Sequence, residues 1–522
     1  MISTPAAGQP PAGPAAPAVD LLVIGGGING TGIARDAAGR GLSAVLCDKD
    51  DLGQGTSSRS SRLIHGGLRY LEHGEVRLVR EALRERETLL RVAPHLVRPL
   101  NFVLPHVPGM RPVWLLRLGL FLYDHLAHRG RLPVSRSLWL DTAPEGRAVQ
   151  PHLRRGFIYS DCRTDDARLV VLNALGAREL GAGVLTRHEL VAAQFRDGLW
   201  QARLRNSQLG TTIDLTARAV VNAAGPWVDA IAGRLDASGR ANRIRLIKGS
   251  HIVVPRFWEG DHGFLLQNTD RRVVFVTPYE SGLALVGTTD VDYSGPPDSV
   301  AVSAEEIDYL CAAANRQLRC SLTAADVVHS YAGVRALVND AQDNPAAVTR
   351  DYVLDLAGVP PRKAAATHAQ GAGPLLTVLG GKITTFRRLA EQAIELLRPV
   401  FPQMGPAWTG HTPLPGGDLA ADDVDAAHAR FLAQAHFLPV EHARGLFERH
   451  GSRAASIFAD TRNLAAMGRH FGAGLYESEA RHFIAHEWAM SAEDVLWRRS
   501  KFGLRLSTEQ HAQFARWISS GD

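Results

Sequence analysis

The chain has 522 residues, of which 45% are hydrophobic and 21% are charged, and its formal net charge is +5 at pH 7. This length exceeds what one hydrophobic core supports, so two or three domains are expected, with the composition of a globular protein. The mild positive charge is spread along the chain without a nucleic-acid recognition motif. It therefore argues against nucleic acid and favours an anionic substrate or an anionic membrane surface.

Residues 1–19 are rich in Ala, Pro and Gly and contain no Lys or Arg, so we expect a disordered leader rather than a signal or transit peptide. Four cysteines are too few and too scattered for a disulfide framework or a metal knuckle: Cys47, Cys162, Cys311 and Cys320. We therefore expect a reducing, cytoplasmic setting and no metal site.

A buried strand, a glycine turn and a helix are predicted by the stretch Asp20-Leu-Leu-Val-Ile-Gly-Gly-Gly-Ile-Asn-Gly-Thr-Gly-Ile-Ala-Arg-Asp36. Gly25, Gly27 and Gly30 stand at G-x-G-x-x-G spacing. They permit a tight turn, close approach of the backbone to a pyrophosphate, and packing of the helix on the strand. The helix start supplies unpaired N–H groups to the phosphates.

The next predicted strand, residues 44–47, ends at Asp48. A carboxylate at that position can accept hydrogen bonds from ribose hydroxyls. Strand, turn, helix and acid thus agree on a dinucleotide cofactor, with NAD and FAD both open at this point. The small-residue loop of residues 49–62 permits close approach to a bound ring system. An amphipathic helix follows at 75–92, with an apolar stripe of Val76, Val79, Leu83 and Leu90.

The most apolar window, residues 113–123, is too short and too interrupted to span a bilayer. It is flanked or punctuated by titratable or positive side chains: Arg111, Arg117, His128 and Arg129. Two interpretations stay open. The segment is either a helix lying in a lipid interface or a buried helix of the second domain.

From residue 157 onward, strands and helices alternate. An antiparallel sheet roofing the cofactor site is predicted from apolar runs at 244–254, 273–278 and 283–288. A strand at 375–379, Gly380-Gly381 and a helix at 382–397 repeat the opening pattern. Beyond a linker at 413–417, the pattern is helical.

Four segments, taken in this order, identify a resemblance: Thr56-Ser-Ser58, His65-Gly-Gly-Leu-Arg-Tyr70, Asn222-Ala-Ala-Gly-Pro-Trp227 and Gly380-Gly-Lys-Ile-Thr-Thr-Phe-Arg-Arg-Leu-Ala390. With the glycine turn, they resemble the FAD-dependent glycerol-3-phosphate dehydrogenases over residues 20–397. The likeness continues weakly through the tail, at His486-Glu-Trp488 and Asp494-Val-Leu-Trp-Arg-Arg499. Two residues depart from the family pattern: Asp48 replaces a common Glu, and Phe386 replaces a usual Tyr.

The resemblance implies an α/β fold with a glutathione-reductase-like FAD-binding domain of the Rossmann type. It also implies a mixed or antiparallel substrate domain like that of D-amino-acid oxidase, and a helical C-terminal domain. The first two are expected to interleave within residues 20–407. The FAD parts are expected at about 20–100, 157–240 and 350–400, the substrate parts at about 101–156 and 241–349, and the helical domain at 408–522.

The implied reaction is oxidation of sn-glycerol 3-phosphate to dihydroxyacetone phosphate, with hydride passing to FAD and electrons to a membrane quinone. A phosphate dianion calls for arginine, and the residues that match family positions are Arg69, Arg335 and Arg350, with Tyr70 beside them. The hydroxyl proton calls for a group with a pKa near neutrality, so His65 and His251 are both candidate bases. Lys382, expected at a helix start, would stabilise the reduced flavin.

The resemblance implies the following FAD contacts: Gly25, Gly27, Asn29, Gly30, Asp48, Thr56, Ser57, Ser58, His65, Gly66, Gly67, Ala224, Gly225, Gly381, Lys382, Ile383 and Thr384. Two alternatives remain: an oxygen-using oxidase of glycerol phosphate, amines or amino acids, and a flavin-fold binding protein without catalysis. The expected location is the cytoplasm, peripheral to the inner face of the cell membrane, with a homodimer left open.

Overall fold

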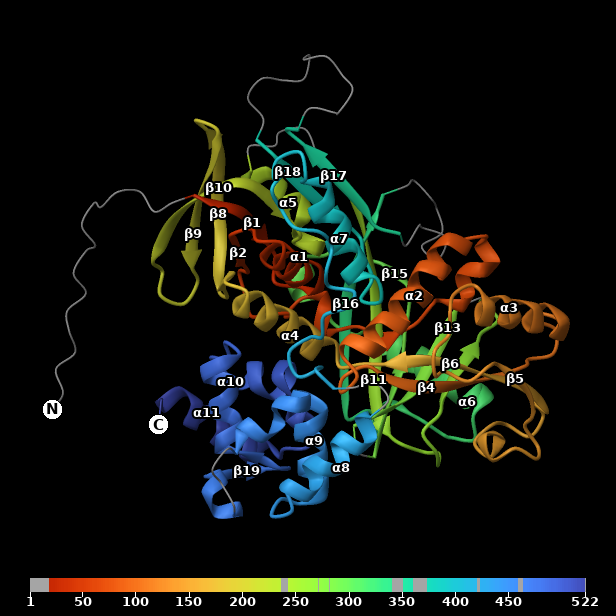
Figure 1. Cartoon of the computed structure of the whole chain (residues 1–522). Coiled ribbons are helices and arrows are strands. Elements are labelled where there is room, and N and C mark those ends of the chain that lie inside the picture. Colours follow the sequence, from red (N-terminus) through yellow and green to blue (C-terminus); the bar gives the residue numbers. More distant parts are fainter. Residues whose placement is uncertain are drawn as a thin grey trace.

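A computed structural model describes residues 18–235, 243–270, 272–280, 282–339, 351–359, 373–419, 423–458 and 463–521. Arg350 and the expected leader up to residue 17 lie outside these ranges. Two large sheets and a cluster of C-terminal helices make up the described chain (Figure 1). Sequence and structure agree on the fold class, an α/β arrangement of mixed sheets with a helical C-terminal region.

The first sheet has eight strands among the described residues, in the order β17-β18-β10-β1-β2-β7, with β9 joining β10 to β8. Its central pairs β18-β10, β10-β1, β1-β2 and β2-β7 are all parallel. The carboxyl ends of three strands from distant parts of the chain therefore meet at one edge. The strands are β1 (Val19–Ile24), β2 (Ala44–Cys47), β7 (Gly183–Leu185), β8 (His188–Arg196), β9 (Leu199–Asn206), β10 (Thr212–Asn222), β17 (Val353–Ala357) and β18 (Leu375–Leu379).

Helix α1 (Ile28–Gly39) packs against both α4 (Asp166–Glu179) and α7 (Phe386–Leu396). Buried apolar side chains of α1, α4 and α7 join those of β1 and β2 in the largest core cluster. On the other face of the sheet, α5 (Val228–Arg234) packs against β8 and contributes Ile231 to a second cluster. The strands β1 and β18 are buried on both faces, as their unbroken apolar runs predict.

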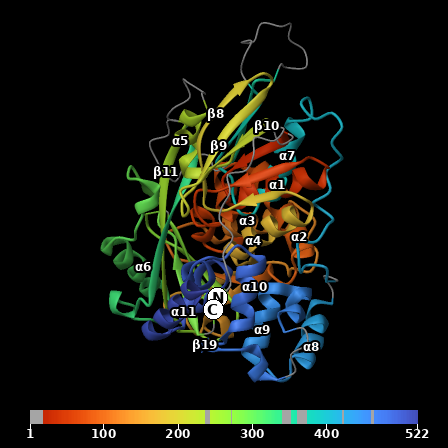
Figure 2. The same cartoon turned by 90° about the vertical axis from the view of Figure 1, so that its left-hand side faces the viewer.

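The second sheet has ten strands in the described residues and stands beside the first (Figures 1 and 2). Its strands are β3 (Leu63–Ile64), β4 (Arg98–Pro105), β5 (Arg136–Trp139), β6 (Arg155–Arg163), β11 (Ile244–Pro255), β12 (Gly263–Gln267), β13 (Val273–Tyr279), β14 (Leu283–Gly287), β15 (Val291–Asp292) and β16 (His329–Val338). Pairing is antiparallel except between β12 and β4. Helix α6 (Ala304–Gln317) covers one face, whereas α2 (Val76–Val92) and α3 (Val113–His125) pack on the opposite face, on the right of Figure 1.

The C-terminal helices gather at one end of the molecule in both views (Figures 1 and 2). They are α8 (Val424–Gln434), α9 (Val440–His450), α10 (Glu477–His486) and α11 (Thr508–Ser520), with the short pair β19 (His470–Gly472) and β20 (Leu475–Tyr476) and a π-helical segment, Asp494–Arg499. Buried ion pairs join this region to the first sheet's side, including Arg168 with Glu487 and Arg499 with Asp51.

Two expected helices differ in detail. The buried face of α2 is formed by Leu78, Val79 and Leu83, whereas Val76 is 45% exposed, so the predicted stripe is offset. Helix α7 begins at Phe386 rather than at residue 382, because residues 383–385 form a turn. Phe386 is buried, with one edge of its ring against Gly32.

Candidate active site

A cavity of about 360 Å³ lies between the two sheets. Its lining comes from the turn after β1, the end of β2, the loop of residues 53–70, the end of β10, strands β11, β13 and β16, and the turn after β18. The parallel-strand edge thus supplies one wall and the antiparallel sheet supplies the other, as the predicted roof requires.

The turn after β1 is shaped by glycines. Gly25 has a φ of +113°, and a Cβ on it would lie 2.5 Å from the Ala223 carbonyl oxygen. A Cβ on Gly30 would lie 1.8 Å from the Gly25 carbonyl oxygen, which is backbone and cannot move aside. Gly27 caps α1 without a side-chain hydrogen bond. The helix N-terminus therefore faces the cavity edge with room for a phosphate group.

Asp48 ends β2 at the cavity wall. Its carboxylate accepts hydrogen bonds from the Gly26 N–H at 2.5 Å and the Asp50 N–H at 2.8 Å. Burial raises its pKa to about 6, against these hydrogen bonds. The shorter Asp side chain thus ties the end of β2 to the glycine turn while still lining the cavity.

Asn29 connects the two glycine turns. Its Nδ2 donates to the Gly380 carbonyl at 3.2 Å, and its buried Oδ1 has no hydrogen-bond partner in the described structure. A Cβ on Gly381, where φ is +103°, would lie 2.6 Å from the Asn29 Nδ2. The Asn29 Oδ1, which has no partner in the described structure, and the space beside the glycines fit a long dinucleotide that extends from the turn after β1 to the turn after β18.

The loop of residues 56–58 packs on the start of α1. The Ile28 N–H donates to the Ser57 Oγ at 3.0 Å, and the Thr56 Oγ1 donates to the Val334 carbonyl at 2.6 Å. Ser57 and Thr56 line the cavity. Ser58, Gly30 and Gly66 are expected cofactor residues that support the lining without being part of it.

Arg335 projects from β16 into the cavity lining. Its guanidinium pairs with Asp290 and donates to the Thr288 Oγ1 at 2.9 Å. Arg69 and Tyr70 line the same cavity from the 3-10 helix Leu68–His73. The cavity therefore brings two of the three expected phosphate ligands together.

The two candidate bases differ in their surroundings. His251 is 1% exposed, stacks on Tyr331 at 4.9 Å between ring centroids, and shares a 2.9 Å hydrogen bond between its Nε2 and the Ser61 Oγ. Burial, with Arg335 and Arg62 nearby, lowers its pKa to about 3. His65 also lines the cavity; its ring meets Phe275 edge to face, and its N–H donates to the Thr384 Oγ1 at 3.2 Å.

Lys382 lies in the turn after β18, four residues before α7 begins. Its Nζ sits 3.8 Å from the centre of the Tyr70 ring, so the ammonium group is held at the cavity wall rather than in the first turn of a helix. The predicted helix-start position is therefore wrong, although the predicted location at the cavity holds. Ala224, Gly225, Ile383 and Thr384 also line the cavity.

Several lining residues were not among the expected site residues: Arg59, Ser60, Ser61, Trp227, Phe275, Thr288 and Asp290. Most of them could have been predicted, because they lie in the run of small residues at 55–61 or in the polar segment that follows β14. Phe275 could not, because its exposure to the cavity depends on how β13 pairs.

Helix α3 has one face in solvent. Leu116, Leu120 and Tyr123 are buried, whereas the opposite face carries Trp114 at 67% exposure, Phe121 at 55% and Leu118 at 47%. The helix is therefore buried on one face only, so the interpretation as a buried helix of the second domain holds for that face alone. No helix in the described part of the chain is long and apolar enough to cross a membrane.

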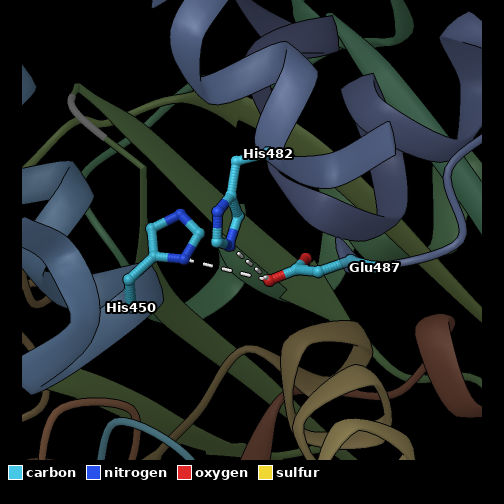
Figure 3. Close-up of side chains that lie close together, drawn as sticks. All are labelled: His450, His482 and Glu487. Carbon is cyan, nitrogen blue, oxygen red and sulfur yellow. Dashed lines mark ion pairs between the residues drawn. The ribbon is translucent and has the colours of Figure 1, made fainter. Parts of the chain in front are cut away.

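A second polar cluster lies in the C-terminal region, where His450, His482 and Glu487 bring ligand atoms within 4.8 Å of one another (Figure 3). Arg168 already pairs with both Glu487 oxygens, and its Nη2 lies 3.0 Å from the Glu487 Oε1. Burial opposes ionisation of Glu487, but Arg168 holds its pKa well below its usual value. Glu487 is therefore already paired with a buried cation in this structure.

Residues 20–387 match the model of the family described as FAD dependent oxidoreductase, and residues 407–516 match the C-terminal domain of alpha-glycerophosphate oxidase. The chain is thus an FAD-dependent oxidoreductase, and its cofactor is FAD. The glycine turn, Asp48 and the second glycine turn are the residues whose geometry fits it.

The glycerol-3-phosphate dehydrogenase of Pseudomonas aeruginosa is 50% identical over 511 residues, covering 98% of this chain and 97% of the relative. The aerobic enzyme of that name from Escherichia coli K12 is 45% identical, covering 96% and 97%. Within the flavin-dependent class, the chain belongs to the family of these glycerol-3-phosphate dehydrogenases.

Two further comparisons bear on substrate and fold. D-Erythritol 1-phosphate dehydrogenase of Brucella abortus is 50% identical, covering 96% of this chain and 98% of the relative. The crystal structure of glycerol-3-phosphate dehydrogenase from Bacillus halodurans complexed with FAD has a TM-score of 0.71 at 26% identity, covering 96% and 94% of the two chains.

Proposed function

We propose that this protein oxidises sn-glycerol 3-phosphate to dihydroxyacetone phosphate and passes the electrons on to a membrane quinone. The observation that carries the proposal is a single cavity that joins both FAD-binding glycine turns to Arg69, Arg335 and His65. The near-full-length relatives named for glycerol-3-phosphate oxidation support it.

Each part of the substrate has a residue suited to it. Arg335, whose fork is oriented by Asp290 and Thr288, binds the phosphate together with Arg69. His65 accepts the proton of the secondary hydroxyl, since burial lowers the pKa of His251 to about 3 and makes it a weak base. Lys382 supplies positive charge at the cavity wall. Bound FAD supplies the hydride acceptor.

A longer polyol phosphate is a second candidate substrate, because the Brucella abortus relative is as similar as the Pseudomonas aeruginosa enzyme. Both substrates share a terminal phosphate and a secondary alcohol, so the proposed residue roles are the same. The extra CHOH unit of erythritol phosphate would need room beyond the reacting carbon.

The exposed face of α3 supports a peripheral attachment to membrane lipid. Trp114, Leu118 and Phe121 form an apolar face, and Arg117 lies on the same exposed side. An amphipathic helix of this kind lies in the plane of a lipid interface, where a quinone is accessible.

Anaerobic addition of glycerol 3-phosphate to the purified flavoprotein tests cofactor, substrate and reaction together. Rapid bleaching of the oxidised flavin bands, followed by reoxidation with a short-chain quinone, is expected. Faster bleaching by erythritol 1-phosphate would favour the second candidate. Rapid peroxide formation in air would indicate an oxidase, and flavin that neither substrate bleaches would contradict the proposal.

A further inference from the structure

A buried hydrogen-bond network lies beneath the loop that carries His65. It joins one residue from each of three elements: Arg86 of α2, Tyr123 of α3 and Asp161 of β6. These elements lie together on the right of Figure 1. All three side chains are nearly inaccessible, with exposures of 4%, 3% and 1%.

The directions of the hydrogen bonds follow from chemistry. The Tyr123 hydroxyl donates to Asp161, with its oxygen 2.7 and 2.9 Å from the two carboxylate oxygens. Its lone pair is then available to accept the Gly66 N–H at 2.7 Å. Arg86 donates to the Asp161 Oδ1 at 2.9 Å and to the Ser160 carbonyl at 2.9 Å. Burial raises the pKa of Asp161, and Arg86 opposes that rise.

The loop is held on two sides at consecutive backbone N–H groups. The His65 N–H reaches Thr384 in the turn after β18, and the Gly66 N–H reaches Tyr123. Gly67, with a φ of +75°, then starts the short helix that carries Arg69 and Tyr70. His65, Arg69 and Tyr70 all line the cavity, so the position of Gly66 controls the expected base and two expected substrate ligands.

The Gly66 backbone is packed closely against Tyr123 and Leu83, with no space for a side chain. A Cβ there would lie 2.7 Å from the Tyr123 hydroxyl and 2.6 Å from the Leu83 Cδ2. Tyr123 can approach the backbone this closely because residue 66 is glycine. A hydroxyl whose only task was to satisfy Asp161 would not need this approach.

We infer that Tyr123, held by Asp161 and Arg86, is a positioning residue that fixes the His65–Tyr70 loop in its reactive geometry. None of the three side chains is a catalytic residue, because they act through the Gly66 backbone. The inference rests on the proposed function for its substrate.

The test compares Tyr123→Phe with wild type in anaerobic stopped-flow reduction of the holoenzyme by glycerol 3-phosphate. A misplacement of about 1 Å can cost up to about a hundredfold in rate, so we expect the limiting rate of flavin reduction to fall on the order of tenfold. The apparent substrate dissociation constant rises by less than the rate falls, because Arg69 and Tyr70 lie on the displaced loop while Arg335 is untouched. Tyr309→Phe in α6, which loses an exposed hydroxyl bond to Asp270 away from the cavity, is the control for loss of a tyrosine hydroxyl and keeps the wild-type rate.

Comparison of Asp161→Asn with Asp161→Ala is an independent test of whether the network positions the His65–Tyr70 loop. It remains usable if Tyr123→Phe folds poorly. The amide oxygen of Asn still accepts the tyrosine proton, and Arg86 keeps Ser160 and Glu87, so the rate is largely retained. Ala loses it. A reduced unfolding temperature with unchanged reduction rates in these variants would overturn the inference. Wild-type flavin that glycerol 3-phosphate does not bleach would instead contradict the proposed function.

Discussion

Arg499 and Asp51 form a fully buried, two-point ion pair between the π-helical segment and the loop after β2, with N–O distances of 2.6 and 2.7 Å. Arg498 adds a third hydrogen bond to Asp51 at 2.5 Å. The C-terminal region is thereby attached directly to the loop that leads into the cavity lining at Gly53.

Replacing Arg499 by Met removes this attachment. Truncating one partner of a buried pair costs about 3–5 kcal/mol. Because the Arg498 contact with Asp51 remains, we expect the free energy of unfolding to fall by about 3 kcal/mol. Chemical denaturation followed by flavin fluorescence and far-UV circular dichroism measures it. Arg430→Met removes an exposed pair with Asp423 and serves as the control, with no measurable change expected. Equal stability of the two variants would contradict the prediction.

Gly30→Ala should abolish FAD retention, because its Cβ would collide with the Gly25 carbonyl oxygen at 1.8 Å. The measurement is the flavin-to-protein absorbance ratio after gel filtration. Gly119→Ala in α3 has open space around its Cβ and keeps full flavin content. Normal flavin content in Gly30→Ala would show that the turn tolerates a different backbone path.

Arg335→Lys should raise the KM for glycerol 3-phosphate by about tenfold to a hundredfold, since the lysine keeps charge but loses the two-point fork worth about 1.5–3 kcal/mol. Steady-state assays with a dye acceptor measure KM and kcat separately. Arg245→Lys changes an arginine on neighbouring β11 that pairs with Asp292, and it should leave KM unaltered. An unchanged KM in Arg335→Lys would place the phosphate elsewhere.

Stability should fall as the pH is lowered from about 6.5 toward 4. Burial lowers the folded-state pKa of His95 to about 3, and those of His442 and His450 to about 4. Their unfolded-state pKa is about 6.5, so the unfolded chain binds more protons than the folded one and is stabilised relative to it throughout this range. Burial opposes ionisation of Glu479, but Arg449 and His450 lower its pKa to about 2, so its contribution is lost only below about pH 4.5.

Thermal unfolding from pH 8 to pH 4.5 measures this dependence. The transition temperature should be nearly constant at the alkaline end and decline below about pH 6.5. His450→Asn, which cannot take up a proton, should show a shallower decline. A transition temperature independent of pH would mean that these histidines take up protons equally in the folded and unfolded states.

Leu118→Glu should weaken binding to vesicles of phosphatidylethanolamine and phosphatidylglycerol, because it places a carboxylate in the exposed apolar face of α3. Flotation on a density gradient measures the bound fraction. Leu209→Glu alters a leucine outside α3 that is more accessible, 75% exposed against 47% for Leu118, and should bind as wild type does. Equal binding of both variants would exclude α3 as the attachment site.

The sequence predicted the glycine turns and the strands around them because their local requirements are strict. Gly25 needs a positive φ, and β18 needs apolar side chains on both faces. The start of α7 was misplaced because Gly380-Gly381 predicts a helix start close by. Ile383, Thr384 and Thr385 form a turn instead, and Phe386 then enters the core.

Other features depend on contacts between distant segments. Whether the apolar helix α3 is covered depends on which element packs over it, and no pattern within residues 113–125 states that. The pairing of Arg335 with Asp290 and the sealing of His251 against Tyr331 arise from the register of β16 on β11. Periodicity cannot supply such a register.

The hydrogen bond between Asn29 and Gly380 spans 351 positions of the chain. On the ribosome, the first glycine turn is made early, whereas its counterpart after β18 emerges only when most of the protein has been synthesised. The nascent chain must therefore keep β1 and β10 available without the neighbour that β18 provides. We therefore expect secure capture of FAD late in the maturation of this protein, after β18 has paired with β10.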